Sequence, residues 1–263
     1  MPSLARIMLH PIKSLDPVIV REATILESGA LEHDRTYAIF DAEGRFVNGK
    51  RHASVHRLRA HYELDVGFVT LSAAPEHSHA LEQTRFHLNC ERALLENWLS
   101  GYFGFRVFVR QDSQRGFPDD TDASGPTILS TATLETIASW FPGLDVENIR
   151  LRLRANLEAG DTAPFWEDRL FAAQGESVSF RIGDVKIEGI NPCQRCVVFT
   201  RDPRSAEAFP EFQKTFSELR KTTLPAWANH SRFNHFYRLA LNTRIPATEA
   251  GKTLKVGDEF TEL

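Results

Sequence analysis

The class of fold is decided by the stretch LRAHYELDVGFVTL at residues 58–71. Apolar side chains alternate with polar or basic ones from Leu58 to Leu64, which is the pattern of a strand with one buried face. A turn at Val66-Gly67 leads into a second apolar run that ends at Leu71. Two consecutive strands are therefore predicted here, and the same kind of pattern recurs along most of the chain.

Outside this stretch, the spacing of apolar residues predicts further strands and helices. The sequence as a whole therefore predicts a mainly β protein with a few helices, of the α+β class. Strands are expected at residues 4–9, 18–26, 150–157 and 177–188, and a hairpin at 36–47 with its loop at 41–44. Helices are expected at 94–99 before Gly101, at 134–141 before Pro142, and at 209–219 with Pro210 in the first turn.

An acidic segment rich in helix and strand breakers, FPDDTDASGP at residues 117–126, separates two more apolar parts of the chain. Such a segment is typical of a boundary between domains. We therefore expect one domain at residues 1–120 and a second at 121–263, each forming a β-barrel-like lobe. Gly-Asp turns at 182–185 and 256–259 are of the kind that small barrels use at their rims.

Composition narrows the class of protein. The chain has 263 residues, of which 42% are hydrophobic, so it can bury a full core without disulfides. A net charge of −4 argues against nucleic acid as the main partner. Three cysteines do not make a secreted disulfide framework, and no run approaches the ~18 apolar residues of a membrane span. Because residues 1–15 also lack a signal-peptide pattern, we expect a cytoplasmic protein with no membrane partner.

The sharpest local signal is NPCQRCVVFT at residues 191–200, which contains Cys193 and Cys196. A structural zinc site would need two more ligands, and an iron–sulfur cluster would need about four thiolates. A thioredoxin-type pair opens a helix, whereas this pair runs into a β-forming Val-Val-Phe-Thr segment. Two interpretations remain. One is a reactive thiol or single soft-metal ligand with Arg195 and Arg201 nearby, and the other is a pair of buried cysteines acting as small hydrophobic residues.

This segment resembles the signature of MOSC domains, the C-terminal domain of molybdenum cofactor sulfurase. It is most similar to the branch that contains the mitochondrial amidoxime-reducing component and its bacterial relatives. The first part of the chain is similar to the MOSC N-terminal β-barrel domain, so that matching segments follow the family's order along nearly the whole chain. They are HPIKS at 10–14, GALEHDR at 29–35, GRF at 44–46, residues 150–156, IGD at 182–184 and KVGD at 255–258.

In that family a molybdenum–pterin cofactor lies between the two domains, and a protein cysteine binds the metal. The resemblance implies that Cys196 is the metal ligand and a catalytic residue, with Cys193 beside it or structural. A soft thiolate suits a metal that the pterin dithiolene already holds, and the phosphate of the cofactor needs Lys, Arg and hydroxyl donors. The residues that the resemblance places against the cofactor are Lys13, Ser14, Arg35, Ser130, Thr131, Arg154, Asn156, Gln194 and Arg195.

Several of these residues also have a purely structural interpretation. Lys13 and Ser14 could belong to an exposed turn, and Arg35 could form a surface ion pair with a neighbouring acid. Ser130 could serve only as a helix N-cap, a role that is compatible with binding an anion. Arg154 could point outward from a strand, because basic residues alternate with apolar ones before it. The residues alone leave these alternatives open.

Three positions depart from the family pattern. The usual Gly-Asp-Arg reads His33-Asp34-Arg35 here, which predicts a different backbone before the arginine. The usual proline between the family's Arg and Asn is Ala155, and the segment FNHF at 233–236 has Asn234 where the family has glycine. We expect this segment to line the substrate opening, with His235 as a catalytic residue that contacts substrate or transfers a proton.

The first functional hypothesis is a molybdenum-dependent oxidoreductase that reduces an N-hydroxylated, N-oxide or S-oxide small molecule. Its electrons would come from a separate flavin or iron–sulfur protein, because three cysteines cannot also hold a standard cluster. The alternative is a sulfur carrier with a persulfide on Cys196, where any pyridoxal phosphate belongs to a partner. A third hypothesis is a non-catalytic barrel. Lys13, Ser14 and Arg35 discriminate between the first two hypotheses, because a carrier needs only the thiol.

Overall fold

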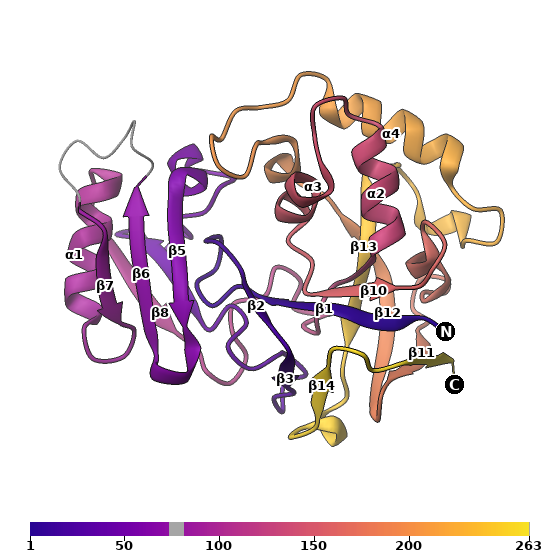
Figure 1. The fold of residues 1–263 in the computed structure, drawn as a ribbon, viewed down its shortest axis with the longest axis horizontal. Helices are drawn as coiled ribbons and strands as arrows, with labels where there is room; N and C mark the ends of the chain where they lie inside the picture. The colour runs from indigo at the N-terminus through magenta and orange to yellow at the C-terminus, as the bar shows by residue number, and fades with distance from the viewer. Residues whose placement is uncertain (74–81, 263) are drawn as a thin grey trace.

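The computed structural model describes residues 1–73 and 82–262, in which the chain forms fifteen strands and four α-helices. Figure 1 shows a smaller lobe, built from residues of the first half, and a larger lobe that contains both termini. The predicted class, mainly β with a few helices, is confirmed. Among the described residues, the helices all fall short of the length and hydropathy that crossing a membrane requires.

The larger lobe is built on an eight-stranded sheet with the order β15-β11-β12-β13-β9-β10-β1-β2. Its neighbours are antiparallel except β9 and β10, which are parallel. The bridge between Ser3 and Glu259 brings β1 against the segment before β15, so the sheet curls like a barrel although its strand order has two ends. The strands are β1 (Ser3–Leu9), β2 (Val18–Val20), β9 (Ile128–Ser130), β10 (Leu157–Gly160), β11 (Val178–Ile182), β12 (Val185–Gln194), β13 (Arg238–Arg244) and β15 (Phe260–Glu262).

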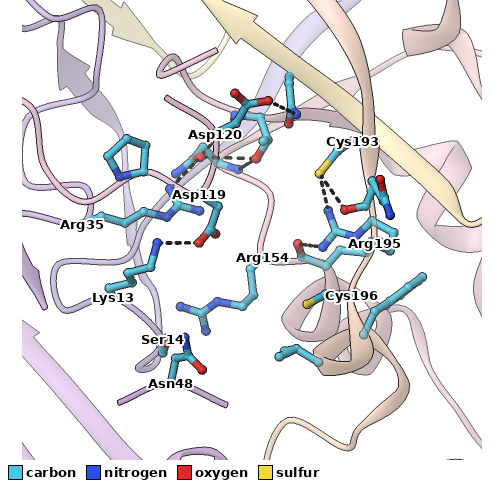
Figure 2. Close-up of a pocket in the computed structure, with 18 of the residues that line it drawn as sticks. Lys13, Ser14, Arg35, Asn48, Asp119, Asp120, Arg154, Cys193, Arg195 and Cys196 are labelled. Atoms are coloured by element: carbon cyan, nitrogen blue, oxygen red, sulfur yellow. Dashed lines mark hydrogen bonds and ion pairs between the residues drawn. The ribbon is translucent and has the colours of Figure 1, made fainter. Parts of the chain in front are cut away.

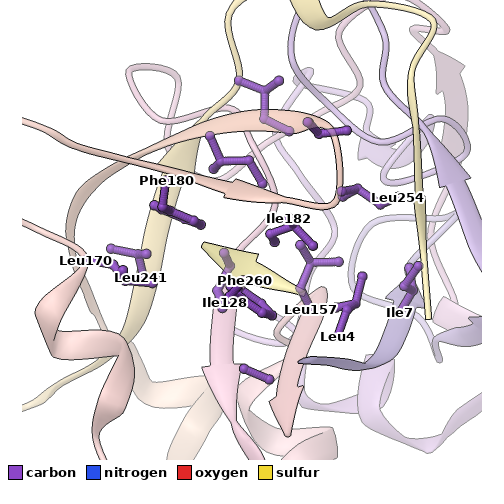
Figure 3. Close-up of a cluster of buried hydrophobic side chains, with 14 of the residues drawn as sticks. Leu4, Ile7, Ile128, Leu157, Leu170, Phe180, Ile182, Leu241, Leu254 and Phe260 are labelled. Atoms are coloured by element: carbon purple, nitrogen blue, oxygen red, sulfur yellow. The ribbon is translucent and has the colours of Figure 1, made fainter. Parts of the chain in front are cut away.

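The core of the larger lobe joins the two ends of the chain (Figure 3). Ile7 of β1, Ile182 of β11 and Leu241 of β13 are fully buried in it, and each such side chain contributes about 1.5–3 kcal/mol. A small sheet of β3 (Glu22–Thr24) and β14 (Thr253–Lys255) adds a second link. The lobes in space therefore do not follow the chain order, and the domain boundary at residue 120 stays a prediction.

The smaller lobe contains the two strands that residues 58–71 predict. β5 and β6 pair antiparallel with Glu63 opposite Phe68, and Leu58 and Tyr62 are buried as the alternation requires. Helix α1 buries Leu95 and its neighbour Leu99 in the same core. The elements of this lobe are β4 (Tyr37–Asp41), β5 (Leu58–Glu63), β6 (Phe68–Ala73), β7 (Thr84–His87), β8 (Val107–Gln111) and α1 (Arg92–Phe103).

Three further helices lie together on the larger lobe (Figure 1). Their apolar faces meet in an aromatic core, where the rings of Phe141 and Phe212 stack with centroids 4.1 Å apart. Ser130 caps the first of them, as predicted, by accepting a hydrogen bond from the Thr133 amide. These helices are α2 (Thr131–Ser139), α3 (Val146–Leu153) and α4 (Phe212–Thr223).

The strand predicted at residues 150–157 is wrong over most of its length. Residues 150–153 form the end of helix α3, because Asp145 caps that helix and Ile149 and Leu153 are buried one turn apart. A sequence in which Arg and Leu alternate is compatible with a strand. It is equally compatible with a helix whose arginines form hydrogen bonds within the protein. The buried guanidinium of Arg150 indeed donates to the carboxylate of Glu158, and β10 begins only at Leu157.

Several element boundaries also differ from the prediction. Residues 197–200, a β-forming run in the sequence, form a 3-10 turn in which Phe199 packs on Phe212 and Phe216. Helix α1 continues past Gly101 to a left-handed cap at Gly104.

Residues 36–47 do not form the predicted hairpin. Strand β4 pairs mainly with β8, and the returning segment contributes one bridge at Phe46. Pro210 precedes α4 instead of lying in its first turn, and Leu94 is exposed.

We expect the substitution Gly189→Ala to destabilise the protein strongly. Gly189 lies in β12, and a Cβ there would stand 1.7 Å from the carbonyl oxygen of Leu170, a backbone atom that cannot rotate away. The forced backbone shift should lower the free energy of unfolding by about 3 kcal/mol. Gly143→Ala is the control, because its φ of +89° strains alanine but nothing lies within 4 Å, so it should cost about 1 kcal/mol. Equal losses in urea unfolding would contradict the packing argument.

Candidate functional site

The main cavity lies between the two lobes and has a volume of about 920 Å³, a size typical of small-molecule sites. Its lining contains eleven Lys and Arg side chains but only four Asp, whereas the whole chain has a net charge of −4. The charges are therefore segregated, and the cavity is suited to an anionic ligand. Figure 2 shows cationic side chains and two cysteines facing this space from opposite sides.

Lys13 stands at the end of the cavity nearest the smaller lobe. Its ammonium donates a hydrogen bond of 2.8 Å to the carbonyl oxygen of Phe117 and pairs with the carboxylate of Asp119. Burial lowers the pKa of Lys13 from its ordinary value, although Asp119 opposes this shift. Lys13 is thus a buried cation that lines the cavity together with Ser14, and it does not belong to an exposed turn.

The Arg35 side chain interacts both with the preceding residue and with a residue of the larger lobe. Its guanidinium pairs with Asp34 and donates to the side-chain oxygen of Asn156 at 3.2 Å. Burial alone would raise the pKa of Asp34, but Arg35 and the hydrogen bonds from His10 hold it well below its ordinary value. The ion pair with a neighbouring acid exists, but it lies in the cavity wall and is only 15% exposed on the arginine side.

Arg154 occupies the C-cap of α3 in the left-handed region, with φ +55°. Its guanidinium donates to the carbonyl oxygen of Leu15 at 2.8 Å, and it has no ion pair within the described residues. Burial, with repulsion from Arg35, lowers the pKa of Arg154 to about 10. The alternative interpretation, an outward position on a strand, is wrong, because the helix cap turns this side chain into the cavity (Figure 2).

The cysteine pair forms the opposite wall. Arg195 donates to the sulfur of Cys193 at 3.3 Å and to the carbonyl oxygen of Leu153 at 2.6 Å, while its buried Nε has no partner among the described residues. Cys196 is exposed, and Figure 2 shows its sulfur directed toward the cavity. Gln194 also lines this wall. The interpretation of two buried cysteines is therefore wrong.

Strained backbone gathers around the cavity. Ser14, Arg35 and Arg154 all have positive φ, in the left-handed region that residues with a Cβ adopt rarely and at a cost of about 1–2 kcal/mol. His33 also lies there, with φ +67°. His33 thus adopts a conformation that glycine favours, and the backbone difference from the family before Arg35 stays a prediction.

Three of the predicted site residues are not among those that line the cavity. Ser130 is fully buried and caps α2, and its hydroxyl lies 2.7 Å from the Thr133 hydroxyl. The hydroxyl of Thr131 donates a hydrogen bond of 2.8 Å to a carboxylate oxygen of Glu158. His235 is half-buried beside the lining residue Asn234, and burial together with Arg238 lowers its pKa. The hydroxyls of Ser130 and Thr131 are thus already bonded within the protein.

Sequence reasoning missed several residues of the cavity wall. Asp119, the partner of Lys13, lies in the acidic segment 117–126 that predicts a domain boundary, where a run of acids gives no sign that one of them pairs with a buried lysine. His56 is also in the wall, with a buried Nε2 that has no hydrogen-bond partner among the described residues, and burial together with Arg154 lowers its pKa to about 4. Arg232 and Arg238 line the wall near the cysteines. No local pattern distinguishes such residues from solvated ones.

A buried carboxylate lies beneath Ser130, outside the cavity lining. Glu167 accepts a hydrogen bond from the Thr133 hydroxyl at 3.1 Å, and its other oxygen is buried without a partner in the described residues. The neighbouring Asp168 forms a buried ion pair with Arg220. Burial, followed by repulsion from Asp168, raises the pKa of Glu167 to about 7. This group therefore titrates near neutral pH inside the fold.

Comparison with known families identifies the fold around this cavity. The family model of the MOSC N-terminal beta barrel domain matches residues 1–102, and that of the MOSC domain matches residues 127–261. The chain belongs to the MOSC domain family. Both matched segments of this MOSC protein contribute to the cavity, the first with Lys13 and Arg35 and the second with Arg154 and Cys196.

Two curated relatives are similar to this MOSC protein along most of its length. Molybdenum cofactor sulfurase of Drosophila grimshawi is 23% identical over 247 residues, and that of Drosophila mojavensis is 25% identical over 246 residues. Each alignment covers 83% of this chain but only 30% of the relative. A solved structure, the YUAD protein from Bacillus subtilis, aligns over 99% of this chain and 94% of its own, with 13% identity and a TM-score of 0.37.

We expect Glu167→Gln to remove a pH-dependent loss of stability. The pKa of this carboxyl is about 7 in the fold against an ordinary value of 4.5, so its contribution to stability is complete below pH 4.5 and is lost as the pH rises through 7. From pH 5 to pH 8, the free energy of unfolding of the variant should rise relative to the parent by about 2 kcal/mol. Urea unfolding at both pH values measures this difference. Glu176→Gln, at an exposed position, is the control, and a pH-independent difference for Glu167→Gln would contradict the assignment.

Proposed function

We propose that this MOSC protein binds a molybdenum–pterin cofactor between its lobes and uses it to reduce N-hydroxylated, N-oxide or S-oxide compounds. The observation that carries the proposal is that Lys13, Arg35 and Arg154 face the same cavity as Cys196. A protein that only carried sulfur would need the thiol alone. Cations from both matched segments of the chain, gathered opposite one accessible thiol, are what an extended anionic cofactor with a metal at one end requires.

The residues at the Lys13 end fit the phosphate of such a cofactor. Arg154 has a guanidinium with a single hydrogen bond, to the carbonyl oxygen of Leu15, and no carboxylate pairs with it among the residues described. Ser14 adds a hydroxyl next to Lys13. A phosphate bound here would gain charge-assisted hydrogen bonds and would compensate the buried charge of Arg154. Asn156 keeps Arg35 oriented through its side-chain oxygen.

The residues at the cysteine end fit a metal that the pterin already holds. Nowhere in residues 1–73 and 82–262 do three His, Cys, Asp or Glu side chains gather as a metal site. One soft ligand, Cys196, therefore suits a metal whose other ligands come from the cofactor. The guanidinium of Arg195, the residue before this ligand in the chain, is held by the carbonyl oxygen of Leu153 and adds a positive charge near it. When bound, the cofactor would supply two-electron chemistry at this position.

The proposed reaction removes one oxygen atom from the substrate as water and consumes two protons and two electrons. The electrons would come from a separate flavin or iron–sulfur protein, because the three cysteines of this chain are too few for a standard cluster beside a metal thiolate. His235, beside the lining residue Asn234, is the proposed proton donor at the opening. Its lowered pKa favours the neutral imidazole, which would have to take up a proton before donating one.

The alternative is a sulfur carrier, which one observation favours. Cys196 is exposed, so a partner's persulfide has access to its sulfur, and the similar Drosophila proteins are named molybdenum cofactor sulfurases. Transfer of a sulfur atom from that persulfide would leave a persulfide on Cys196 and a thiol on the partner. This function makes no use of Lys13 or Arg154, and for this reason we place it second.

The decisive experiment compares the parent with Cys196→Ala and Cys193→Ala, each purified from a host that makes the cofactor. Molybdenum by elemental analysis and pterin by fluorescence after oxidation are measured per chain. We expect near-stoichiometric metal in the parent. Because Cys196→Ala removes the proposed ligand, its metal content should fall about tenfold or more. Cys193→Ala is the matched control and should retain most of the metal.

Three results would contradict the oxidoreductase. One is a parent that carries neither molybdenum nor pterin from such a host. Another is a Cys196→Ala variant with the metal content and visible spectrum of the parent. The last is a parent that instead gains the mass of one sulfur atom, lost in Cys196→Ala, after incubation with a persulfide donor, which would favour the carrier.

A further inference from the structure

Two arginines, Arg232 and Arg238, line the wall of the cavity near the cysteines and are close enough for their charges to interact. Arg232 ends a short 3-10 turn, His230–Arg232, and Arg238 begins strand β13. Arg232 donates to the carbonyl oxygens of Ala172 and Ala173 at 3.1 and 3.0 Å. Both arginines line the cavity and are half-buried, so their guanidinium groups are held in place but remain accessible to a ligand.

Arg238 is held by neutral acceptors as well. Its guanidinium donates twice to the side-chain oxygen of Asn234, at 3.2 and 3.0 Å, and once to the carbonyl oxygen of Pro192 at 3.1 Å. Burial and the nearby charge of Arg232 lower the pKa of Arg238. The two guanidinium groups thus repel each other, and in the described part of the chain no carboxylate lies within ion-pair distance of either.

This arrangement differs from that of three other cations in the same cavity, each of which has an acidic partner. Lys13 pairs with Asp119, Arg35 with its neighbour Asp34, and Arg59 with Asp16 at 3.2 Å. A cation pair without a counter-charge is costly when it is partly desolvated, and an anion bridging both guanidinium groups would remove that cost. Two planar forks at one place are well suited to a carboxylate.

The pair also lies where a substrate would react. The pairing of β12 with β13 places Arg238 opposite Gln194, within the Cys193–Cys196 segment. The thiol of Cys193 is close enough to act on the pKa of Arg238. An anion bound by the two arginines would therefore lie beside the proposed metal ligand and away from Lys13, at the opposite end from the proposed phosphate site.

We propose that Arg232 and Arg238 bind a carboxylate of the substrate, so that the preferred substrates are N-oxides or N-hydroxylated compounds that carry a carboxylate. The assignment of a substrate rests on the proposed function, whereas binding of the anion does not. Asn234 is a positioning residue here. Its side-chain oxygen fixes the Arg238 guanidinium, a role that a glycine at this position would leave empty.

The test uses a matched pair of probes, pyridine N-oxide and its 3-carboxylate, with protein from the cofactor-producing host. Reduction to the pyridine and water is followed with reduced benzyl viologen as the electron source. We expect Arg238→Gln and Arg232→Gln each to raise KM for the carboxylate about tenfold or more, because each variant loses the charge-assisted hydrogen bonds of one guanidinium to the carboxylate. Both variants should leave kcat/KM for the neutral probe within about twofold.

The control variant is Arg244→Gln, at the far end of the same strand, where the arginine pairs with Glu188 and does not line the cavity. It should leave both probes unchanged. Arg238→Lys retains the charge but not the fork, and it should restore part of the carboxylate affinity. Circular dichroism and thermal unfolding establish that each variant is folded before it is compared.

A second measurement needs no turnover. Calorimetric titration of the unreduced protein with the 3-carboxylate and with the neutral probe measures anion binding directly. Binding that is weakened equally in Arg232→Gln and Arg238→Gln, with no reduction of either probe by the parent, would uphold the anion site and contradict the reduction of N-oxides. Carboxylate binding unchanged in both arginine variants, or lost only in Lys13→Gln, would overturn the anion site.

Discussion

A buried ion pair ties the cavity to the fold: the guanidinium of Arg35 with the carboxylate of Asp34, extended to the side-chain oxygen of Asn156. A buried charge costs several kcal/mol unless it is paired and hydrogen-bonded. Here the pair is bonded on both sides, because Asp34 accepts from the His10 amide and Asn156 donates to the Met8 carbonyl oxygen. These groups come from β1, from the connection into the smaller lobe and from the turn after α3. The pair therefore holds together the segments that carry the cationic end of the cavity.

The cavity keeps a surplus of positive charge because many of its cations are bonded to backbone carbonyl oxygens and not to acids. Arg154 and Arg195 show this arrangement most clearly, with bonds to Leu15 and Leu153. A carbonyl orients a guanidinium without neutralising it, so the charge remains available to a ligand. The proposed phosphate site and the proposed carboxylate site use two ends of the same cationic cavity, and the thiol of Cys196 faces the space they share. An anionic cofactor and an anionic substrate can both be bound without competing for the same donors.

Ser130 shows how a residue implied by family resemblance takes a structural role. Its hydroxyl accepts from the Thr133 amide and contacts the Thr133 hydroxyl, which in turn donates to Glu167. A helix N-terminus in principle attracts an anion, and here the anion beneath it is a carboxylate of the chain itself. The elevated pKa of Glu167 is the consequence of placing that carboxylate in the interior beside Asp168. The residues near Ser130 in the sequence do not predict a contact with Glu167, which lies more than thirty positions later.

Local pattern determined the class of fold, since the alternation at residues 58–71 has only one low-energy backbone, and the order of short motifs determined the family. The spacing of Cys193 and Cys196 left several interpretations open, and only the resemblance to MOSC domains implied that Cys196 is the thiol that faces the cavity. Tertiary structure decided what no local window contains: that Arg154 ends a helix and turns inward, that Lys13 has its counter-charge in Asp119, and that the chain brings together cations over 200 residues apart. The physical reason is that periodicity reports which backbone conformation buries apolar side chains, whereas the position of a charge depends on the partners that long-range strand pairing brings to it.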